Sequence, residues 1–337
     1  MQLNKNISLK SYNTFGVEVK AQLLIDIESE EELKQAYQST EFMALPKLVL
    51  GGGSNILFTK NQRKVILKIN IKGIDVLDQK DHEVRVKVGA GEIWHQFVLW
   101  CLDHNLAGVE NLSLIPGTVG AAPIQNIGAY GVELKDIFDS LEAYEIKSGK
   151  VRLFDKEQCQ FDYRHSFFKG RGKDQYVITS VTFKLTTKPR FDVSYSGIQK
   201  RLSEQGLQLN IHNISESVIH IRQTKLPDPV KIGNAGSFFK NPIIEKPLYD
   251  ALNLIHEDLP HYPVDSKNIK IPAAWLIEQC GWKGKRKDKI GVHERQPLVL
   301  VNYGGGKGRD ILKLSKKIQL SIQKKFGIDL KTEVNIF

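Results

Sequence analysis

Long apolar segments are missing from this sequence of 337 residues. A helix that crosses a bilayer needs about 20 consecutive, predominantly apolar residues, and the chain has no such run. Residues 1–5 also lack the apolar core of a secretory signal peptide. We therefore expect a protein that acts in the cytoplasm and has no membrane partner.

Cysteine is scarce as well. The three thiols, Cys101, Cys159 and Cys280, lie far apart and form no CxxC pair. This spacing argues against a disulfide framework and against a thiolate metal site. The nine histidines form no HExxH motif and no cluster with Asp, so no metal site is expected. We interpret the cysteines as buried, reduced thiols.

Acidic residues are outnumbered by basic ones. The chain has 48 Lys and Arg residues and 38 Asp and Glu residues, which gives a formal net charge of +10. Such an excess suits an anionic partner: a nucleic acid, an acidic surface or a phosphorylated small molecule. The densest basic cluster is Lys285, Arg286 and Lys287, which a solvated loop explains equally well. Because no zinc-finger, homeodomain or RRM signature accompanies it, nucleic-acid binding is kept as an alternative and not expected.

The chain is longer than one core normally serves, so two or three domains are expected. Pro227 and Pro229 interrupt regular structure and indicate a linker near residues 224–229. Before the linker, β-branched and alternating patterns predict strands, and turn-free amphipathic stretches predict helices. The predicted strands are 64–69, 84–88 and 176–183, and the predicted helices are 30–37 and 93–106.

The part after the linker has a different order of elements. Its patterns predict a helix over 272–279, a buried strand over 296–301 and a last short strand over 330–337. Between them, Asp310 is placed to cap a helix whose apolar residues recur at helical spacing up to Phe326, and Gly327 is placed to stop it. Both parts of the chain are therefore α+β, the first one richer in strands.

A short glycine turn, Gly51, Gly52 and Gly53, lies between two apolar runs and is followed by Ser54 and Asn55. Three residues without Cβ allow backbone N–H groups to converge on a phosphate, to which Ser54 adds a hydroxyl donor. No GK[ST] follows, so the turn is not a P-loop, and no helix-opening GxGxxG makes it a Rossmann fingerprint. By itself the motif is equally a tight turn between strands.

A second loop, residues 114–131, carries four glycines, two prolines and three alanines and almost no charge. Small uncharged residues allow a backbone to approach a flat or bulky ligand closely, and long irregular loops are usually functional. Gln125 and Asn126 supply donors for ring or phosphate oxygens. A third glycine loop, residues 304–309, fails the Walker pattern and is interpreted as a flexible connection.

Together these motifs resemble the UDP-N-acetylenolpyruvoylglucosamine reductase family, in its longer variant with a tyrosine-bearing loop around Tyr262. The resemblance runs over essentially the full length. The segments that carry it are SYNTFG (residues 11–16), LGGGSN (50–55), IPGTVGAAPIQNIGAYG (115–131), YRHS (163–166), GNAGSFFKNP (233–242) and Glu333 with Val334.

The resemblance implies an α+β fold of the vanillyl-alcohol-oxidase type, also called PCMH-type. It comprises two FAD-binding subdomains, expected at residues 1–70 and 71–220, and a C-terminal α+β substrate-binding domain at 221–328. The tail, 329–337, is expected to return to the second subdomain. Oxidases of this group often tether FAD through a His near the glycine turn, whereas this chain has Ser54 there, so noncovalent FAD is expected.

The implied reaction is the NADPH-dependent reduction of an enolpyruvyl ether on a UDP-sugar to a lactyl ether, through FAD. Arg164 resembles the family's electrophilic group, Ser237 its proton donor and Glu333 the partner of Arg164. Without the resemblance, the more common interpretations of these three residues are a surface arginine, a turn or cap serine and a solvated glutamate. Activation by neighbours and exclusion of water are what a serine needs to act as an acid.

The resemblance also assigns binding roles. The cofactor-binding set is Leu50, Gly51, Gly52, Gly53, Ser54, Asn55, Pro116, Gly117, Thr118, Gly120, Ala121, Gln125, Asn126, Gly128, Tyr130 and Arg222. The substrate-binding set is Tyr130, Tyr195, Lys225, Asn241, Tyr262, Lys283 and Gln296, with the two lysines facing the diphosphate by charge.

One residue departs from the family pattern. The family often has Arg two residues after the terminal Glu, and this chain has Asn335 at that position. A carbohydrate oxidase of the same fold remains an alternative activity, and the missing tethering His speaks against it. The expected assembly state is a monomer.

Overall fold

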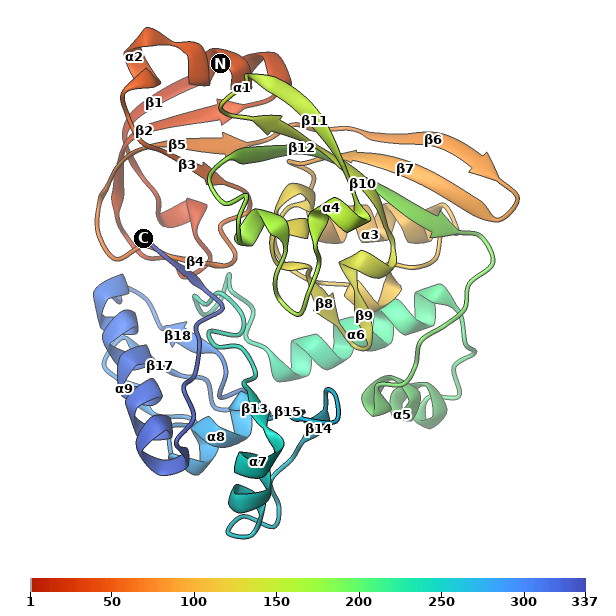
Figure 1. Cartoon of the computed structure of the whole chain (residues 1–337), viewed down its shortest axis with the longest axis vertical. Helices are drawn as coiled ribbons and strands as arrows, with labels where there is room; N and C mark the ends of the chain where they lie inside the picture. Colours follow the sequence, from red (N-terminus) through yellow and green to blue (C-terminus); the bar gives the residue numbers. More distant parts are fainter. Residues whose placement is uncertain (1) are drawn as a thin grey trace. The chain divides into compact units, whose positions relative to one another are not determined.

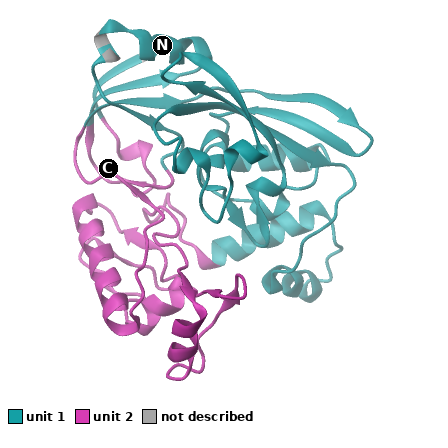
Figure 2. Cartoon of the chain, in the orientation of Figure 1, with its two compact units in different colours: residues 1–7, 21–53, 63–224 teal, residues 8–20, 54–62, 225–337 magenta. Residues whose placement is uncertain are grey.

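The computed structural model describes residues 2–337, without the side chains of residues 2, 41 and 43. The chain forms two compact units, each built from several segments (Figure 2). Unit 1 comprises residues 1–7, 21–53 and 63–224, and unit 2 comprises residues 8–20, 54–62 and 225–337. The division after Thr224 falls at the predicted proline linker. The finer boundaries at residues 70, 220 and 328 stay a prediction.

Unit 1 contains a four-stranded sheet in the order β1-β2-β5-β3. Its strands are β1 (Gln2–Ser8), β2 (Lys20–Ile27), β5 (Gln62–Ile69) and β3 (Lys47–Leu50), and β3 runs parallel to β5. Two helices follow β2, α1 (Glu30–Gln38) and α2 (Thr40–Met43). Ser29 caps α1 because its side chain accepts a hydrogen bond from the backbone N–H of Glu32.

The second sheet of unit 1 is five-stranded and antiparallel, in the order β11-β10-β12-β7-β6 (Figure 1). Its strands are β11 (Lys150–Asp155), β10 (Phe138–Glu145), β12 (Tyr176–Thr186), β7 (Glu83–Gly89) and β6 (Ile74–Lys80). Alternation along β7 buries its three valines, Val84, Val86 and Val88, which occupy every second position. The predicted strands 64–69, 84–88 and 176–183 and the helix 30–37 are confirmed.

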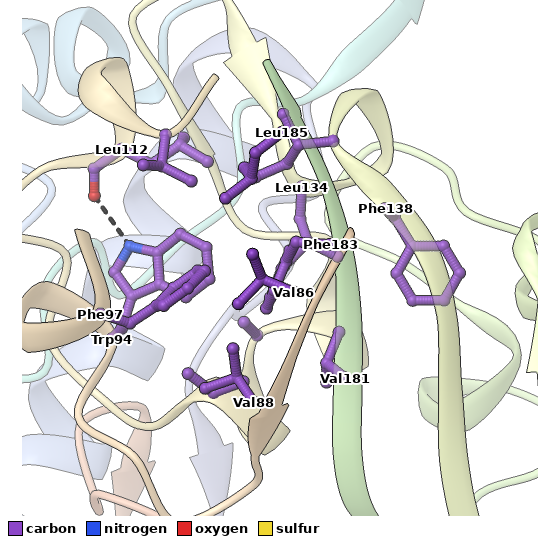
Figure 3. Close-up of a cluster of buried hydrophobic side chains, with 14 of the residues drawn as sticks. Val86, Val88, Trp94, Phe97, Leu112, Leu134, Phe138, Val181, Phe183 and Leu185 are labelled. Carbon is purple, nitrogen blue, oxygen red and sulfur yellow. Dashed lines mark hydrogen bonds between the residues drawn. The ribbon is translucent and has the colours of Figure 1, made fainter. Parts of the chain in front are cut away.

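The main core of unit 1 lies between this sheet and helix α3 (Trp94–Asp103). Phe97 stacks on Phe183 with ring centroids 4.7 Å apart, and both rings are fully buried. The indole N–H of Trp94 donates to the carbonyl of Leu112 at 2.9 Å (Figure 3). Through this bond the core also fixes the chain just before the long loop.

The remaining elements of unit 1 are short or lie near its end. They are α4 (Lys156–Cys159), α5 (Ser196–Glu204), α6 (Ile211–Lys225), whose last residue falls in unit 2, and the two-residue strands β8 (Gly128–Ala129) and β9 (Val132–Glu133). Helices α5 and α6 share a small apolar cluster that includes Ile198 and Val218. This cluster positions the face of α6 that carries Arg222.

Unit 2 contains two small sheets, β13-β15-β14 and β16-β17-β18. Its strands are β13 (Ile243–Glu245), β14 (Tyr262–Pro263), β15 (Asn268–Lys270), β16 (Arg286–Lys287), β17 (Ile290–Val292) and β18 (Leu300–Asn302). Its helices are α7 (Lys246–Asn253), α8 (Ala273–Gln279) and α9 (Gly308–Phe326). Near the C-terminus, β19 (Asn335–Ile336) pairs in parallel with β4 (Ile56–Leu57).

Several predicted boundaries in the chain are wrong. The helix predicted to reach Leu106 ends at Asp103, because Asn105 adopts a left-handed φ of 55°. The strand predicted from Gln296 begins at Leu300, since residues 296–299 form a turn closed by Val299 N–H on the carbonyl of Gln296. The tail forms only the two-residue strand β19.

The long helix α9 starts differently from its prediction. Lys307 occupies the N-cap and Asp310 lies in the first turn, where its charge still favours the helix dipole. Gly327 ends the helix with a φ of 68°, as predicted. The glycine loop before α9 is held by the side chain of Asn302. Its Oδ1 accepts hydrogen bonds from the N–H groups of Gly304 and Gly306.

The cysteines are reduced. Cys101 and Cys159 are buried as expected, whereas Cys280 is partly exposed. Within residues 2–337, no helix combines the length and the apolar character that crossing a bilayer requires.

Candidate active site

The glycine turn of unit 1 packs directly against the long loop. A Cβ placed on Gly51 would lie 2.6 Å from Thr118 Oγ1, and one on Gly52 would lie 2.9 Å from the Cα of Gly117. Contacts this short require glycine at both positions. Strand β3, which ends at the buried Leu50, delivers the turn to this place, and Gly53 follows with a φ of 65°. Two predicted cofactor-binding segments thus form one small-residue cradle.

Backbone hydrogen bonds hold the long loop on the turn that precedes α3. Val119 N–H donates to the carbonyl of Glu92 at 2.8 Å, and Gly120 N–H donates to Ala90 at 2.9 Å. A Cβ on Gly120 would lie 2.5 Å from the Cβ of Ala90. The stretch that begins with Pro116 and includes Ala121 is therefore ordered around short 3-10 turns. Its irregular backbone is satisfied by these bonds.

Asn126 organises the second half of the loop. It is fully buried and left-handed, with a φ of 44°. Its side-chain N–H₂ donates to Glu133 Oε2 at 2.9 Å and to the carbonyl of Asp162 at 3.2 Å, while its oxygen accepts from Lys135 N–H at 3.0 Å. Asn126 thus shapes the loop, and its contact with a cofactor stays a prediction, as does that of the neighbouring Gln125.

Arg164 extends from a tight bridge that Asp162 and His165 form with each other. Its backbone is left-handed, with a φ of 53°, and its guanidinium donates to the carbonyl of Gly128 at 2.7 Å. The side chain is half-buried. A non-glycine residue held at positive φ is uncommon and points to a function that needs this side-chain direction. The predicted electrophile is thereby fixed to the predicted cofactor loop.

Tyr130, Tyr195 and Arg222 form a cluster in unit 1. The two tyrosine rings meet edge-on with centroids 4.9 Å apart. The guanidinium of Arg222, on α6, interacts electrostatically with the Tyr130 side chain, and burial lowers the pKa of Arg222. Burial also raises the pKa of the Tyr130 hydroxyl. An arginine remains charged in spite of such a shift, so this cluster carries one buried positive charge.

One polar atom of this cluster lacks a partner. The Nε of Arg222 is buried and has no hydrogen bond to any of the described residues. A buried N–H of a charged group costs free energy unless a ligand satisfies it. The orphaned guanidinium nitrogen fits an anionic group such as the diphosphate of a dinucleotide, and FAD is a dinucleotide of this kind.

Sequence reasoning missed two residues behind this cluster. The amide of Asn111 donates to the carbonyls of Tyr130 and Asp192, at 2.8 and 2.9 Å. The ring of His95 accepts from Leu114 N–H at 3.0 Å. Burial, with the charge of Arg222, lowers the pKa of His95. No local motif marks either residue, because their partners are distant in sequence.

In unit 2, the segment that carries Ser237 lies between two others. Ser237 bridges Val299 on one side, and on the other side Phe238 accepts from the backbone N–H of Glu333 at 2.8 Å. The Ser237 hydroxyl has no hydrogen-bond partner among the residues described. Unit 2 therefore brings Ser237 and Glu333 onto adjoining extended segments, and the approach of Arg164, which belongs to unit 1, to both of them stays a prediction.

Asn335 attaches the tail to Asn55. Its side-chain N–H₂ and its backbone N–H each donate to the carbonyl of Asn55 at 3.1 Å, and the amide of Asn55 donates to the carbonyl of Glu333 at 3.4 Å. The residue that departs from the family pattern thus holds the tail that carries Glu333 next to Asn55.

The SYNTFG segment packs against the start of the segment that carries Ser237. Asn13 closes its own turn by donating to the carbonyls of Leu9 and Val17. The carbonyl of Phe15 accepts from the Asn302 amide at 2.8 Å, and a Cβ on Gly233 would lie 2.3 Å from that carbonyl. Gly233 is therefore needed for close backbone approach.

The predicted substrate-binding residues of unit 2 already have protein partners. Asn241 accepts from Ala273 N–H and so caps α8. Lys283 forms an ion pair with Glu278 at 2.7 Å, Gln296 accepts from Leu298 N–H, and Tyr262 lies exposed on β14 with Lys270 over its ring. Tyr195 belongs to unit 1, where it is the N-cap of α5, and Lys225 ends α6. Their contacts with a substrate stay predictions.

Matches to known proteins first define the class. The sequence model of the FAD binding domain matches residues 21–154, which contain the glycine turn and the long loop. The model of the UDP-N-acetylenolpyruvoylglucosamine reductase C-terminal domain matches residues 228–337. The chain is therefore an FAD-dependent flavoprotein whose C-terminal part is typical of one reductase.

Full-length relatives then define the family. The chain is 49% identical to the UDP-N-acetylenolpyruvoylglucosamine reductase of Amoebophilus asiaticus, over 100% of this chain and 99% of that one. It is 45% identical to the enzyme of Flavobacterium johnsoniae over 100% of both chains. It belongs to the UDP-N-acetylenolpyruvoylglucosamine reductase family.

A solved structure supports the fold assignment. The reductase from Thermus caldophilus superposes with a TM-score of 0.72 at 24% identity, and the match covers 100% of this chain and 99% of that one. The predicted α+β flavin-binding fold with a C-terminal domain is confirmed by this match and by the two domain models.

Proposed function

We propose that this protein reduces UDP-N-acetylglucosamine enolpyruvate to UDP-N-acetylmuramate with NADPH and noncovalent FAD, in the synthesis of peptidoglycan precursors. Membership of the reductase family over the full length carries the proposal. Ser54, which replaces the tethering His of related oxidases, supports noncovalent binding. We therefore prefer this activity to the two alternatives raised by the sequence, a carbohydrate oxidase of the same fold and a nucleic-acid-binding protein. We further propose a monomer that acts in the cytoplasm and contacts neither nucleic acid nor membrane.

The FAD site is proposed to comprise the glycine cradle and the Tyr130–Arg222 pair. When bound, FAD supplies the hydride chemistry between NADPH and the enolpyruvyl group. Because Gly51, Gly52 and Gly117 have no side chains, the two segments of the cradle pack closely together, and their backbone N–H groups are proposed to bind the cofactor. The unpartnered Nε of Arg222 is a donor for an anionic oxygen of the cofactor.

The chain's own residues are proposed to handle charge and proton. Arg164 binds the substrate carboxylate, on which negative charge grows during reduction, and Glu333 orients this arginine. Ser237 Oγ donates a proton to the carbon next to that carboxylate. Its hydroxyl has no hydrogen bond to the described residues, so its proton is available. Exclusion of water from the site makes this weak acid competent.

The diphosphate and sugar of the substrate are proposed to contact the remaining set. Lys225 and Lys283 supply positive charge, and Tyr195 closes over the diphosphate. Tyr262 lies exposed on the short strand β14, where a tyrosine-bearing loop can reach a bound substrate. Asn241 and Gln296 each use the side-chain oxygen as an acceptor within unit 2, and among the described residues nothing accepts from their side-chain N–H₂ groups.

Separate measurement of the two half-reactions tests this proposal. In Ser237→Ala, flavin reduction by NADPH should continue at the wild-type rate, while reduction of the enolpyruvyl substrate should fall by at least roughly 100-fold. The exposed Ser266→Ala in the same unit serves as control and should change neither. Equal losses in both half-reactions of Ser237→Ala would reject the role of this serine as proton donor.

A further inference from the structure

Unit 1 has an open cavity of about 630 Å³ that involves none of the residues proposed for FAD or substrate. This volume is in the range of small-molecule sites. The cavity lies where the ends of α1, β3, β5 and the β10–β11 turn meet. Its lining comprises Tyr37, Gln38, Leu45, Pro46, Lys47, Lys64, Tyr144, Ile146, Lys147, Ser148, Gly149 and Asp174.

Two tyrosine hydroxyls in this cavity lack partners. Tyr144 is 2% exposed, and its ring lies 5.6 Å from that of Tyr37. Within residues 2–337, neither hydroxyl makes a hydrogen bond. Burial raises the pKa of both groups, so both remain protonated donors at neutral pH. Both hydroxyls line the cavity and can donate to a ligand that enters it.

The charge of the lining is positive. The lining contains three lysines, Lys47, Lys64 and Lys147, and one carboxylate, that of Asp174. Lys47 is fixed in place, because its Nζ donates to the carbonyl of Phe42 at 2.8 Å and lies 5.2 Å from the centre of the Tyr37 ring. Lys147 is exposed and has no ion pair with any described residue. Cations and hydroxyl donors together are the groups that bind phosphate oxygens.

The lining also contains apolar side chains and oxygen acceptors. Leu45 is 40% exposed, and Pro46 and Ile146 line the same space. Asp174 and Gln38 offer oxygen acceptors for hydroxyl or amino groups. A simple inorganic anion would use only the lysines and the tyrosine hydroxyls, whereas a phosphorylated sugar or nucleotide would use the whole lining.

We propose that this cavity is a second binding site, for a phosphate-bearing small molecule of the sugar-phosphate or nucleotide class. The phosphate oxygens accept from Lys64, Lys147 and the hydroxyl of Tyr144, and the remainder of the ligand contacts the apolar lining residues Leu45, Pro46 and Ile146. The site is separate from the one that reduces the substrate, so the inference does not depend on the proposed activity.

Calorimetry on the flavin-loaded protein tests the site, with inorganic pyrophosphate and ADP as probes. The charge reversal in Lys147→Glu should weaken pyrophosphate binding at one site by at least roughly 10-fold. Tyr144→Phe, which removes only a hydroxyl, should weaken it by roughly 3-fold. Lys80→Glu reverses an exposed lysine outside the lining and serves as the matched control. Turnover of the enolpyruvyl substrate should stay at the wild-type rate in all three variants.

The outcomes separate clearly. ADP that binds more tightly than pyrophosphate assigns a nucleotide, and equal affinity assigns the phosphates alone; either supports the site. Identical affinity and stoichiometry in wild type, Lys147→Glu and Tyr144→Phe would overturn it, because all remaining binding would then belong to the substrate site. Loss of binding in Lys80→Glu as large as in Lys147→Glu would also overturn it, since the effect would then be one of net charge.

Discussion

His95 and Leu114 are joined by a hydrogen bond in which the imidazole Nδ1 accepts from the backbone N–H at 3.0 Å. Leu114 has a left-handed φ of 57° and is the first residue of the long loop that packs on the glycine turn. An imidazole accepts only in its neutral form, and burial together with the charge of Arg222 keeps the pKa of His95 below its usual value. His95 thus sets the entry to the loop.

This relationship predicts a dependence on pH. The unfolded chain takes up a proton at the usual His pKa of about 6.5, above that of the folded state. The contribution of His95 to stability is therefore fully present above that pH and is lost as the pH falls through the lowered folded-state pKa. Thermal unfolding and flavin retention, followed from about pH 8 to pH 5, should show this decline.

Two variants at this position isolate the effect. In His95→Asn, the amide oxygen accepts at every pH, so the part of the acid-induced decline that His95 causes should disappear. In His95→Leu, the N–H of Leu114 loses its acceptor, and the free energy of unfolding should fall by about 1 kcal/mol at neutral pH. An unchanged pH profile in His95→Asn would show that other groups cause the decline.

Gly52→Ala should weaken FAD binding. The added methyl group would lie 2.9 Å from the Cα of Gly117, and backbone yields less easily than a flexible side chain. Overpacking of this kind costs about 1–3 kcal/mol, which here would open the cradle. The flavin content of purified protein and the FAD dissociation constant measure the effect. Gly206→Ala, where φ is 59° and no atom lies within 4 Å, introduces backbone strain without crowding and should retain FAD.

Arg222→Lys should release FAD more readily than wild type. Lysine keeps the charge and loses the Nε that has no partner among the described residues. Loss of a hydrogen bond to a charged group corresponds to about 1.5–3 kcal/mol, or at least roughly a tenfold weaker affinity. Arg201 provides the matched control, because its Nε is also buried and unpartnered. If Arg201→Lys and Arg222→Lys weaken FAD equally, the assignment of Arg222 to the cofactor is wrong.

Asn335→Ala should loosen the tail. It removes the side-chain donor to the carbonyl of Asn55 and leaves the backbone N–H bond in place. One lost hydrogen bond costs about 1 kcal/mol, which corresponds to a melting temperature lower by about 2 °C. Substrate reduction should slow as well, because Glu333 lies two residues upstream. A variant with unchanged melting temperature and unchanged half-reactions would show that the parallel pairing of β4 and β19 suffices.

Local patterns predicted the elements that local physics controls. Alternation of valines marked β7, and the capped, turn-free stretch marked α1. Gly327 stopped α9 because only a left-handed residue without Cβ strain suits that position. Predictions failed where a distant or non-periodic feature decided the end, as with Asn105 after α3 and the turn at Gln296.

The candidate site was predictable as far as its chemistry is written in residue type. The three glycines, the uncharged loop and the motifs with Arg164, Ser237 and Glu333 indicated the family from the sequence. Their partners were not predictable, because a hydrogen bond such as that between Asn335 and Asn55 joins residues 280 apart. Asn126 was expected to donate to a cofactor, yet its side chain is buried and bonded within the loop.

The sequence by itself determined the positions of the glycines, the positions of the charged residues and the family whose motifs the chain carries. These features follow from residue identity and short-range spacing. Only the tertiary structure decided that Gly52 meets Gly117, that Tyr144 faces a basic cavity with an unpartnered hydroxyl and that His95 accepts from Leu114. The physical reason is that packing and hydrogen bonds between distant segments depend on how the whole chain returns on itself, which no local window of sequence contains.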